Sequence, residues 1–347
     1  MKTFWLLSLL GCQVASFSTT PPPHAASSHT VLRASSTDST SSSSTDETTT
    51  IPLLDRDRYV ASNRFAVRAG KEAKFEKRWA TRKSRLAELD GFRYFHLMRR
   101  VSLEEDGTVT YDGGDDKESS QGNYVSFTIW DNKPAFTAWR KGDAFKEAHG
   151  GTSLTAFVST MVSSALVLRG PPRPVFYDGL LVQSEPPEVV PATVNGWRTD
   201  IEFPTDGSTL PVECFVACNQ FFVPSETAAA FEQRWKNRES QLRSCDGFVS
   251  FSMLRRDAKM KDRHAKSDAG TEEPTYMSTT IWKDRASFDK WRSGANFSKA
   301  HGKDNNDKKE EEEDAKPAAA APTPQWSRPP IPVFYEGTLV ISTKEGA

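Results

Sequence analysis

The pattern of apolar and polar residues occurs twice along the chain. Every second residue from Tyr59 to Phe65 is apolar except Asn63, which predicts a strand whose apolar face also carries this asparagine. The same spacing returns from Phe215 to Phe221, with Asn219 in the position of Asn63. An amphipathic helical stripe follows each strand, formed by Phe75, Trp79, Leu86 and Leu89 in the first copy and by Phe231, Trp235, Leu242 and Cys245 in the second.

The rest of each copy predicts two strands, a second helix and a last strand. In the first copy we expect strands over residues 92–99 and 124–130, with Asp131 as the N-cap of the helix that follows. Gly142 interrupts this helix, as Gly294 does in the second copy, before a second short turn. A final strand, over residues 175–183 or 333–343, completes the order β-α-β-β-α-β.

Tryptophans mark the repeat most clearly. Six of the nine fall into three pairs, namely Trp79 with Trp235, Trp130 with Trp282, and Trp139 with Trp291. A repeat of this extent indicates two related α+β modules in tandem. Each module alone would expose one face of a four-stranded sheet, so we expect the two to form an intramolecular pseudo-dimer.

The expected boundaries follow from these patterns and from composition. They are a signal peptide (1–16), a disordered transit-like segment (17–54), a first module (55–183), a linker (184–210), and a second module (211–345) that carries an acidic, alanine-rich insert (303–328). Instead of an insert, the first module has apolar residues at helical spacing from Leu154 to Leu168, which predict an additional core helix.

Composition and charge narrow the function. The chain has 347 residues, of which 37% are hydrophobic and 26% charged, as in soluble globular proteins. A formal net charge of -1 gives no electrostatic footprint for nucleic acid, so no nucleic-acid partner is expected. The sequence contains no Walker loop, no G-x-G-x-x-G loop, no Cys-x-x-Cys spacing and no Ser-His-Asp order, so nucleotide, zinc and hydrolase functions have no support.

The N-terminal residues predict a targeting leader. Lys2 precedes an apolar run over residues 4–10 and then small residues up to Ser16, which is a signal-peptide pattern. This run is too short to span a bilayer, so no stable membrane insertion is expected. Ala15-Ser16-Phe17 resembles the cleavage motif of plastid leaders in algae with secondary plastids. We therefore expect a plastid protein, with secretion as the alternative.

Three cysteines remain beyond the leader. Cys214 and Cys218 lie on one face of a predicted strand, too far apart along it to form a disulfide. We expect both, together with Cys245, to be small buried hydrophobic residues.

A specific resemblance appears in the second helical region. The run from Trp139 to His149, W-R-K-G-D-A-F-K-E-A-H, preceded by Thr128-Ile129-Trp130, resembles the antibiotic-biosynthesis-monooxygenase family. It is most similar to the haem-degrading, staphylobilin-forming branch of that family. The resemblance covers residues 59–183 and 215–343. It implies two ferredoxin-like modules that form a pseudo-dimeric α+β barrel, with one chain supplying both halves.

The resemblance also implies a site in each module. In the haem-degrading branch the site residues are an Asn on the first strand, a Trp on the second helix, and a His ten residues after that Trp. They correspond to Asn63, Trp139 and His149 in the first module and to Asn219, Trp291 and His301 in the second. Neutral imidazole suits haem iron, a carboxamide can donate a hydrogen bond to bound oxygen, and a bulky indole can distort the porphyrin.

In this hypothesis haem is both cofactor and substrate. His149 and His301 are the iron ligands, and the reaction needs an electron donor such as a ferredoxin or a reductase. Two other functions stay open, because a fold does not determine a function. One is a cofactor-independent monooxygenase acting on a small aromatic substrate, and the other is a haem-binding module without catalysis. Structural roles in packing are also common for Trp and His.

Overall fold

The computed structural model describes the chain from Ile51 to Ala347, apart from several internal segments. Residues 105–107, 112–121, 149–163, 239, 258, 261–272, 295–296 and 298–324 lie outside the described part, as do residues 1–50. All of the predicted leader except residues 51–54, most of the additional helix and most of the acidic insert therefore lie outside it. His149 and His301 lie outside it as well.

Each module contributes four antiparallel strands. Across the first module their order is β5 (Arg173–Ser184), β1 (Arg58–Phe65), β4 (Tyr124–Trp130) and β2 (Phe92–Leu103). Across the second it is β11 (Ile331–Ser342), β8 (Cys214–Phe221), β10 (Tyr276–Trp282) and β9 (Phe248–Arg256). A short strand, β3 (Val109–Tyr111), pairs with the end of β2. The strands predicted from the sequence are confirmed in both modules.

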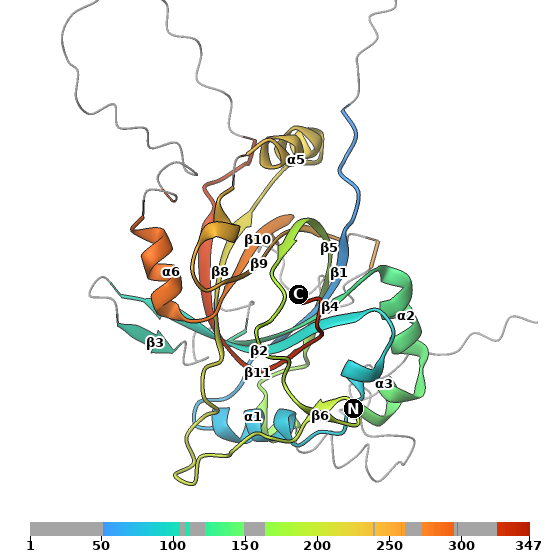
Figure 1. Ribbon diagram of the computed structural model, residues 1–347, viewed down its shortest axis with the longest axis vertical. Coiled ribbons are helices and arrows are strands. Elements are labelled where there is room, and N and C mark those ends of the chain that lie inside the picture. Colours follow the sequence, from blue (N-terminus) through green and yellow to red (C-terminus); the bar gives the residue numbers. More distant parts are fainter. Residues whose placement is uncertain are drawn as a thin grey trace, which may run out of the picture. The chain divides into compact units, whose positions relative to one another are not determined.

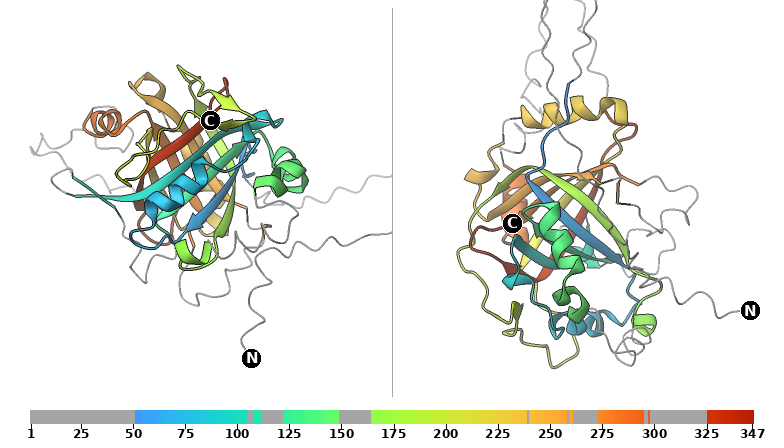
Figure 2. Two further views of the ribbon diagram at one scale, coloured as in Figure 1. Left: turned by 90° about the horizontal axis from the view of Figure 1, so that it is seen from below. Right: turned by 90° about the vertical axis from the view of Figure 1, so that its right-hand side faces the viewer.

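Two seams join the modules into a closed eight-stranded barrel (Figures 1 and 2). β5 pairs with β9 at one seam, and β11 pairs with β2 at the other. At each seam the pairing register shifts beside a left-handed leucine, Leu181 (φ 52°) in β5 and Leu339 (φ 54°) in β11. Such bulges bend a strand and increase its twist, which suits a curved wall. The predicted pseudo-dimeric α+β barrel is therefore confirmed.

The helices lie outside the barrel wall (Figure 1). The first module has α1 (Glu72–Ala80), the 3-10 turn η2 (Leu86–Glu88), α2 (Lys133–Lys141) and α3 (Asp143–Ala148). The second has the 3-10 turns η3 (Ser225–Thr227) and η4 (Leu242–Ser244) and the helices α5 (Ala228–Lys236) and α6 (Arg285–Arg292).

Two details of the predicted helices are wrong. The first helical stripe does not form one helix up to Leu89, because the helix ends at Ala80 and η2 is separate. The N–H of Ala87 in η2 donates to the Gly196 carbonyl of the linker at 3.0 Å, a bond that replaces a helical one. The N-cap of α2 is Asn132, whose side chain accepts from the Ala135 N–H at 2.9 Å.

The residue expected as that N-cap has another partner. Asp131 pairs with the guanidinium of Arg93 instead of the helix N-terminus. Asp284, which matches Asn132 in sequence, caps α6 by accepting from the Ser287 N–H at 2.7 Å. The predicted break at Gly142 is confirmed, since Gly142 separates α2 from α3.

Buried apolar side chains form three clusters. One fills the barrel interior and includes Cys214 and Cys218, as expected. The other two, which we call outer cluster 1 and outer cluster 2, lie between the barrel wall and the helices of the first and second modules, respectively. Cys245 follows η4 and is partly exposed, so its predicted burial is wrong.

The linker packs on the first module. It forms a hairpin of β6 (Thr193–Val194) and β7 (Trp197–Arg198) around Asn195 and Gly196, both of which have positive φ. Trp197 is only 4% exposed, lies in outer cluster 1, and donates its indole N–H to the Ala80 carbonyl at 3.1 Å. The linker therefore contributes to the core as well as joining the modules.

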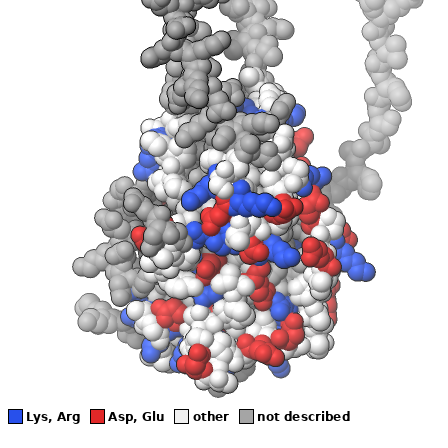
Figure 3. All heavy atoms as spheres, turned by 60° about the vertical axis from the view of Figure 1, so that its left-hand side comes forward, with Lys and Arg blue, Asp and Glu red and all other residues white. Residues whose placement is uncertain are grey.

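The surface mixes both signs of charge. On the face shown in Figure 3, Lys and Arg alternate with Asp and Glu, in keeping with the small net charge. Among the described residues, no helix has the length and hydropathy needed to cross a membrane.

Candidate functional site

The predicted tryptophan of the first module lies on its outer face. Trp139 is carried by α2 and packs against Trp130 of β4, with ring centroids 5.4 Å apart. The ring of Phe136 lies 5.8 Å away, and Phe145 of α3 meets the indole edge-on at 5.0 Å. The Gly142 break thus lets α3 fold back onto the tryptophan.

The second module repeats this arrangement. The Trp291 ring lies 5.4 Å from Trp282 and 5.9 Å from Phe288, and Phe297 meets it at 4.9 Å in an edge-on geometry. Both predicted tryptophans are partly buried. Their packing is consistent with a structural role and leaves part of each side chain accessible.

The predicted asparagines lie on the same outer faces. Asn63 of β1 and Asn219 of β8 are partly buried. Neither carboxamide makes a hydrogen bond within the described part of the chain. An amide half withdrawn from water and without a protein partner can bind a ligand at little desolvation cost.

The strand separates the asparagine from the tryptophan. Trp139 packs on Trp130, which is paired in register with Tyr59, four residues before Asn63 on β1. Four residues of strand span roughly 13 Å. Ala61 lies between Tyr59 and Asn63 on the same face, and its side chain is too small to fill the gap between them. The structure therefore places Asn63 and Trp139 on one face without direct contact.

The structure does not place the two predicted iron ligands. α3 ends at Ala148, directly before His149, and α6 ends at Arg292, nine residues before His301. A different histidine, His96 of β2, is fully buried in the barrel interior with its Nδ1 3.7 Å from the Cys214 sulfur. Burial lowers the pKa of His96 to about 3, so it is a neutral core residue.

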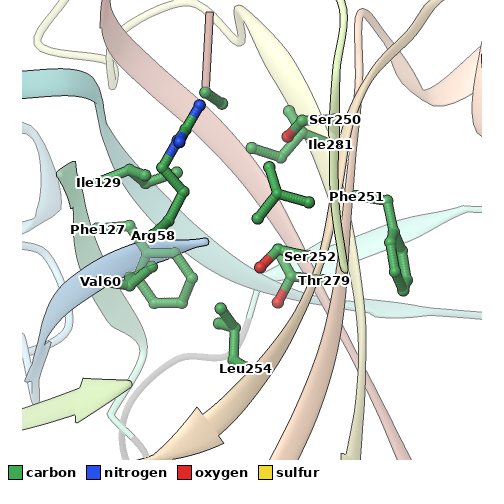
Figure 4. A pocket seen from close by; sticks show the side chains of 12 residues that line it. Arg58, Val60, Phe127, Ile129, Ser250, Phe251, Ser252, Leu254, Thr279 and Ile281 are labelled. Carbon is green, nitrogen blue, oxygen red and sulfur yellow. The ribbon is translucent and has the colours of Figure 1, made fainter. Parts of the chain in front are cut away.

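A small cavity opens into the barrel interior (Figure 4). Its volume is about 20 Å³, on the scale of a single water molecule, and Arg58, Ser250, Ser252 and Thr279 are its polar lining. Ser252 occupies the position in β9 that His96 occupies in β2. The smaller side chain leaves the space that histidine fills at the other seam, and this space is too small for an aromatic substrate.

A larger cavity of about 240 Å³ lies beside α1, between Glu72, Arg99 and Tyr111. Its buried cation already has protein partners, since the Arg99 guanidinium donates to the Leu210 carbonyl at 2.8 Å and lies 3.4 Å from the Glu76 carboxylate. Neither of these two cavities is lined by the predicted asparagines or tryptophans. No group of three or more His, Cys, Asp or Glu side chains among the described residues could hold a metal ion.

The sequence reasoning did not single out a buried glutamate in each module. Glu76 of α1 accepts hydrogen bonds from the Tyr124 hydroxyl at 2.7 Å and from the Leu210 N–H at 2.5 Å. Glu232 of α5 accepts from the Tyr276 hydroxyl at 2.7 Å and from the Leu54 N–H at 2.6 Å. The signal was the repeated F-E-x-R-W run, in which a charged residue recurs beside the apolar stripe.

These glutamates have a structural role. Each is paired with an arginine, Glu76 with Arg99 at 3.4 Å and Glu232 with Arg255 at 2.9 Å. Each also holds the segment that leads into the first strand of the opposite module, since Leu210 precedes β8 and Leu54 precedes β1. Burial raises the pKa of Glu76, and its bonded partners oppose this shift. Glu76 and Glu232 therefore connect α1 and α5, respectively, to the opposite module.

Comparison with known proteins gives two matches to one family. The antibiotic biosynthesis monooxygenase family matches residues 58–151 and 214–303. The haem oxygenase (staphylobilin-producing) of Staphylococcus haemolyticus (strain JCSC1435) is 30% identical over 111 residues, which cover 32% of this chain and 91% of that protein. The haem oxygenase (staphylobilin-producing) of Staphylococcus saprophyticus is 32% identical over 97 residues, covering 28% and 78%, respectively.

Among solved structures, a putative monooxygenase from Fusobacterium nucleatum aligns with a TM-score of 0.47 and 9% identity, over 84% of this chain and 97% of that one. The two matches to the family model are matches of sequence and do not depend on this structural alignment. Because they span more than half of its residues in two consecutive segments, this chain is a tandem member of the antibiotic biosynthesis monooxygenase family.

Proposed function

We propose that this protein is a haem-binding monooxygenase that degrades haem oxidatively, with one candidate site on the outer face of each module. The observation that carries the proposal is the repeated pair of an asparagine without a partner among the described residues and a half-buried tryptophan on one face. The similarity of part of this chain to staphylobilin-producing haem oxygenases supports the choice of haem over other substrates.

Each residue has a distinct role in this proposal. His149 and His301 hold the iron of the haem substrate, since neutral imidazole is a common haem ligand. The carboxamides of Asn63 and Asn219 would be the hydrogen-bond donors available to the reacting oxygen. Trp139 and Trp291 press on the porphyrin, and the rings packed behind them resist displacement. The described residues fit this use, because aromatic surface and a free amide share each face.

Hemin titration tests the proposal. Purified protein from about Leu53 onward is mixed with hemin, and a Soret shift is expected. Addition of a reductant in air should then bleach the band, and an assay for released iron should report the same reaction. Binding without bleaching would indicate a haem-binding module instead.

Substitution of the asparagines separates binding from turnover. Asn63→Ala combined with Asn219→Ala should leave hemin affinity within about threefold and slow bleaching by roughly ten- to a hundredfold, because the amide acts only after oxygen arrives. Asn123→Ala is not a suitable control, since that side chain clamps the backbone of Val67. Asn195, in the exposed turn of the linker, is the matched control, and Asn195→Gly should leave turnover unchanged. Oxidation of a small aromatic substrate by a protein that shows no Soret shift with hemin would favour the cofactor-independent monooxygenase.

A further inference from the structure

The two outer faces differ where the modules meet. Asp257 directly follows β9 of the second module, and its carboxylate accepts a hydrogen bond from the Tyr59 hydroxyl of the first module at 3.1 Å. The same carboxylate pairs with the ammonium of Lys133, also in the first module. Only 7% of the Asp257 side chain is exposed, against 30% of the Lys133 side chain, so these contacts are partly buried.

Asp257 belongs to a short turn that lies on the first module. Its backbone N–H donates to the Phe176 carbonyl of β5 at 2.8 Å, and its second carboxylate oxygen accepts from the Lys259 N–H at 3.2 Å. Met260, at the end of this turn, packs against outer cluster 1. The second module therefore supplies part of the outer face of the first.

A chain of contacts leads from Asp257 to the candidate site. Lys133 is the first residue of α2, and the Tyr59 ring lies 5.3 Å from Phe136 in the next turn. Phe136 in turn lies 5.8 Å from Trp139. Because a helix is stiff over two turns, fixing its first turn against β1 also fixes the position of Trp139.

The second module has apolar residues at two of the three corresponding positions. By the internal repeat, Tyr59, Lys133 and Asp257 correspond to Phe215, Arg285 and Val101. Phe215 and Val101 are buried in outer cluster 2. Arg285 pairs within its own helix, with Asp289 at 2.7 Å. Val101 has no charge, so it cannot form with Arg285 the ion pair that Asp257 forms with Lys133.

The charge of Asp257 is maintained in its buried position. Burial raises its pKa, but the hydrogen bonds from Lys133 and Tyr59 outweigh that effect, and the pKa lies below its usual value. A buried carboxylate that keeps its charge strongly favours the geometry in which its partners are present, since an uncompensated buried charge is costly.

We infer that Asp257 of the second module is a positioning residue for the candidate site of the first module: it fixes the start of α2, and with it Trp139, against β1. The two sites are therefore not equivalent, and only the first depends on this contact between modules. The role in haem chemistry rests on the proposed function, whereas the positioning of α2 does not.

Hydrogen–deuterium exchange tests the positioning without haem. Asp257→Asn keeps the size of the side chain and removes its charge, so amides of α2 should exchange about tenfold faster while those of α6 stay unchanged. The matched control is Asp289→Asn, which breaks the ion pair inside α6 and should leave α2 unchanged. Unchanged exchange in α2 of the Asp257→Asn protein would overturn the inference.

A second variant guards against a general loss of stability. Tyr59→Phe combined with Asp257→Val installs the apolar pair that the second module already uses, so the protein should fold. Its α2 amides should still exchange faster than those of the wild type, and equal exchange would overturn the inference.

Hemin binding then separates the inference from the proposed function. In a His301→Ala background, which leaves only the first site, Asp257→Asn should shift the Soret band and weaken hemin binding about tenfold. In a His149→Ala background it should have no effect. Faster exchange in α2, together with no hemin binding by the wild type, would uphold the positioning and overturn the proposed function.

Discussion

At the scale of single residues, the modules share most of their buried side chains and differ at a few buried polar positions. The rings around Trp139 and Trp291 match pair by pair, and so do the contacts of Glu76 and Glu232. The position of His96 is serine in the second module. A buried polar side chain needs a specific partner, so such a change alters local chemistry without altering the fold.

His96 should make the protein sensitive to acid. Its pKa of about 3 in the fold is below the ordinary value of 6.5, so the unfolded chain binds a proton that the folded protein excludes. Stability is therefore full above about pH 6.5 and falls as the pH drops toward 3, by about 1.4 kcal/mol per unit. Denaturant unfolding of wild type and His96→Leu at pH 7, 6, 5 and 4 measures this. Parallel pH profiles for the two proteins would contradict the assignment.

At the scale of elements, local pattern identified the strands and missed the ends of helices. The spacing of two residues that places Asn63 and Asn219 on the apolar faces of β1 and β8 is a short-range signal, and it predicts both strands correctly. The break after Ala80 was not visible, because the bond that stabilises η2 comes from Gly196, far along the chain. The N-cap was placed one residue early, since Asp131 and Asn132 are equally suitable by type and Arg93 decides between them.

The linker shows the same limit. Its prolines predict a linker, and the hairpin at Asn195-Gly196, a typical hairpin turn, is not among the predicted elements. The candidate residues themselves came from the repeat and the resemblance. Sequence could not reveal that Asp257 reaches the first module, because that contact joins residues about 200 positions apart.

We expect Trp197 to stabilise the first module. Trp197→Ala removes a buried ring from outer cluster 1 and its hydrogen bond to Ala80, which should lower the free energy of unfolding by about 3–5 kcal/mol. The matched control is Val194→Ala in the same hairpin, which is 58% exposed and should cost less than about 0.5 kcal/mol. Equal, small effects of both substitutions in urea titrations would show that the linker does not contribute to the core.

At the scale of the whole described unit, the barrel joins both modules in one core. Strand pairing at two seams, the interior cluster and the paired glutamates all connect the modules. The sequence predicted this closure through the repeat, because one module alone leaves a sheet face and two sheet edges uncovered. Which strands meet at the seams follows only from the structure.

The closed barrel predicts a monomer. Fusion keeps the effective concentration of the second module at roughly millimolar or above, so pairing within one chain should prevail over pairing between chains. Light scattering of the protein from about Leu53 onward should give the mass of one chain across a wide concentration range. A stable dimer with exchanged modules would contradict the assignment of both barrel halves to one chain.

The most direct test of the central claim, that this tandem barrel binds haem at its two outer-face sites, is the hemin stoichiometry of four proteins. These are the wild type, His149→Ala, His301→Ala and the double variant. Each single variant should lose the haem of its own module, and the double variant should show no Soret shift while remaining folded by circular dichroism. An unchanged Soret band and stoichiometry in the double variant would contradict the account.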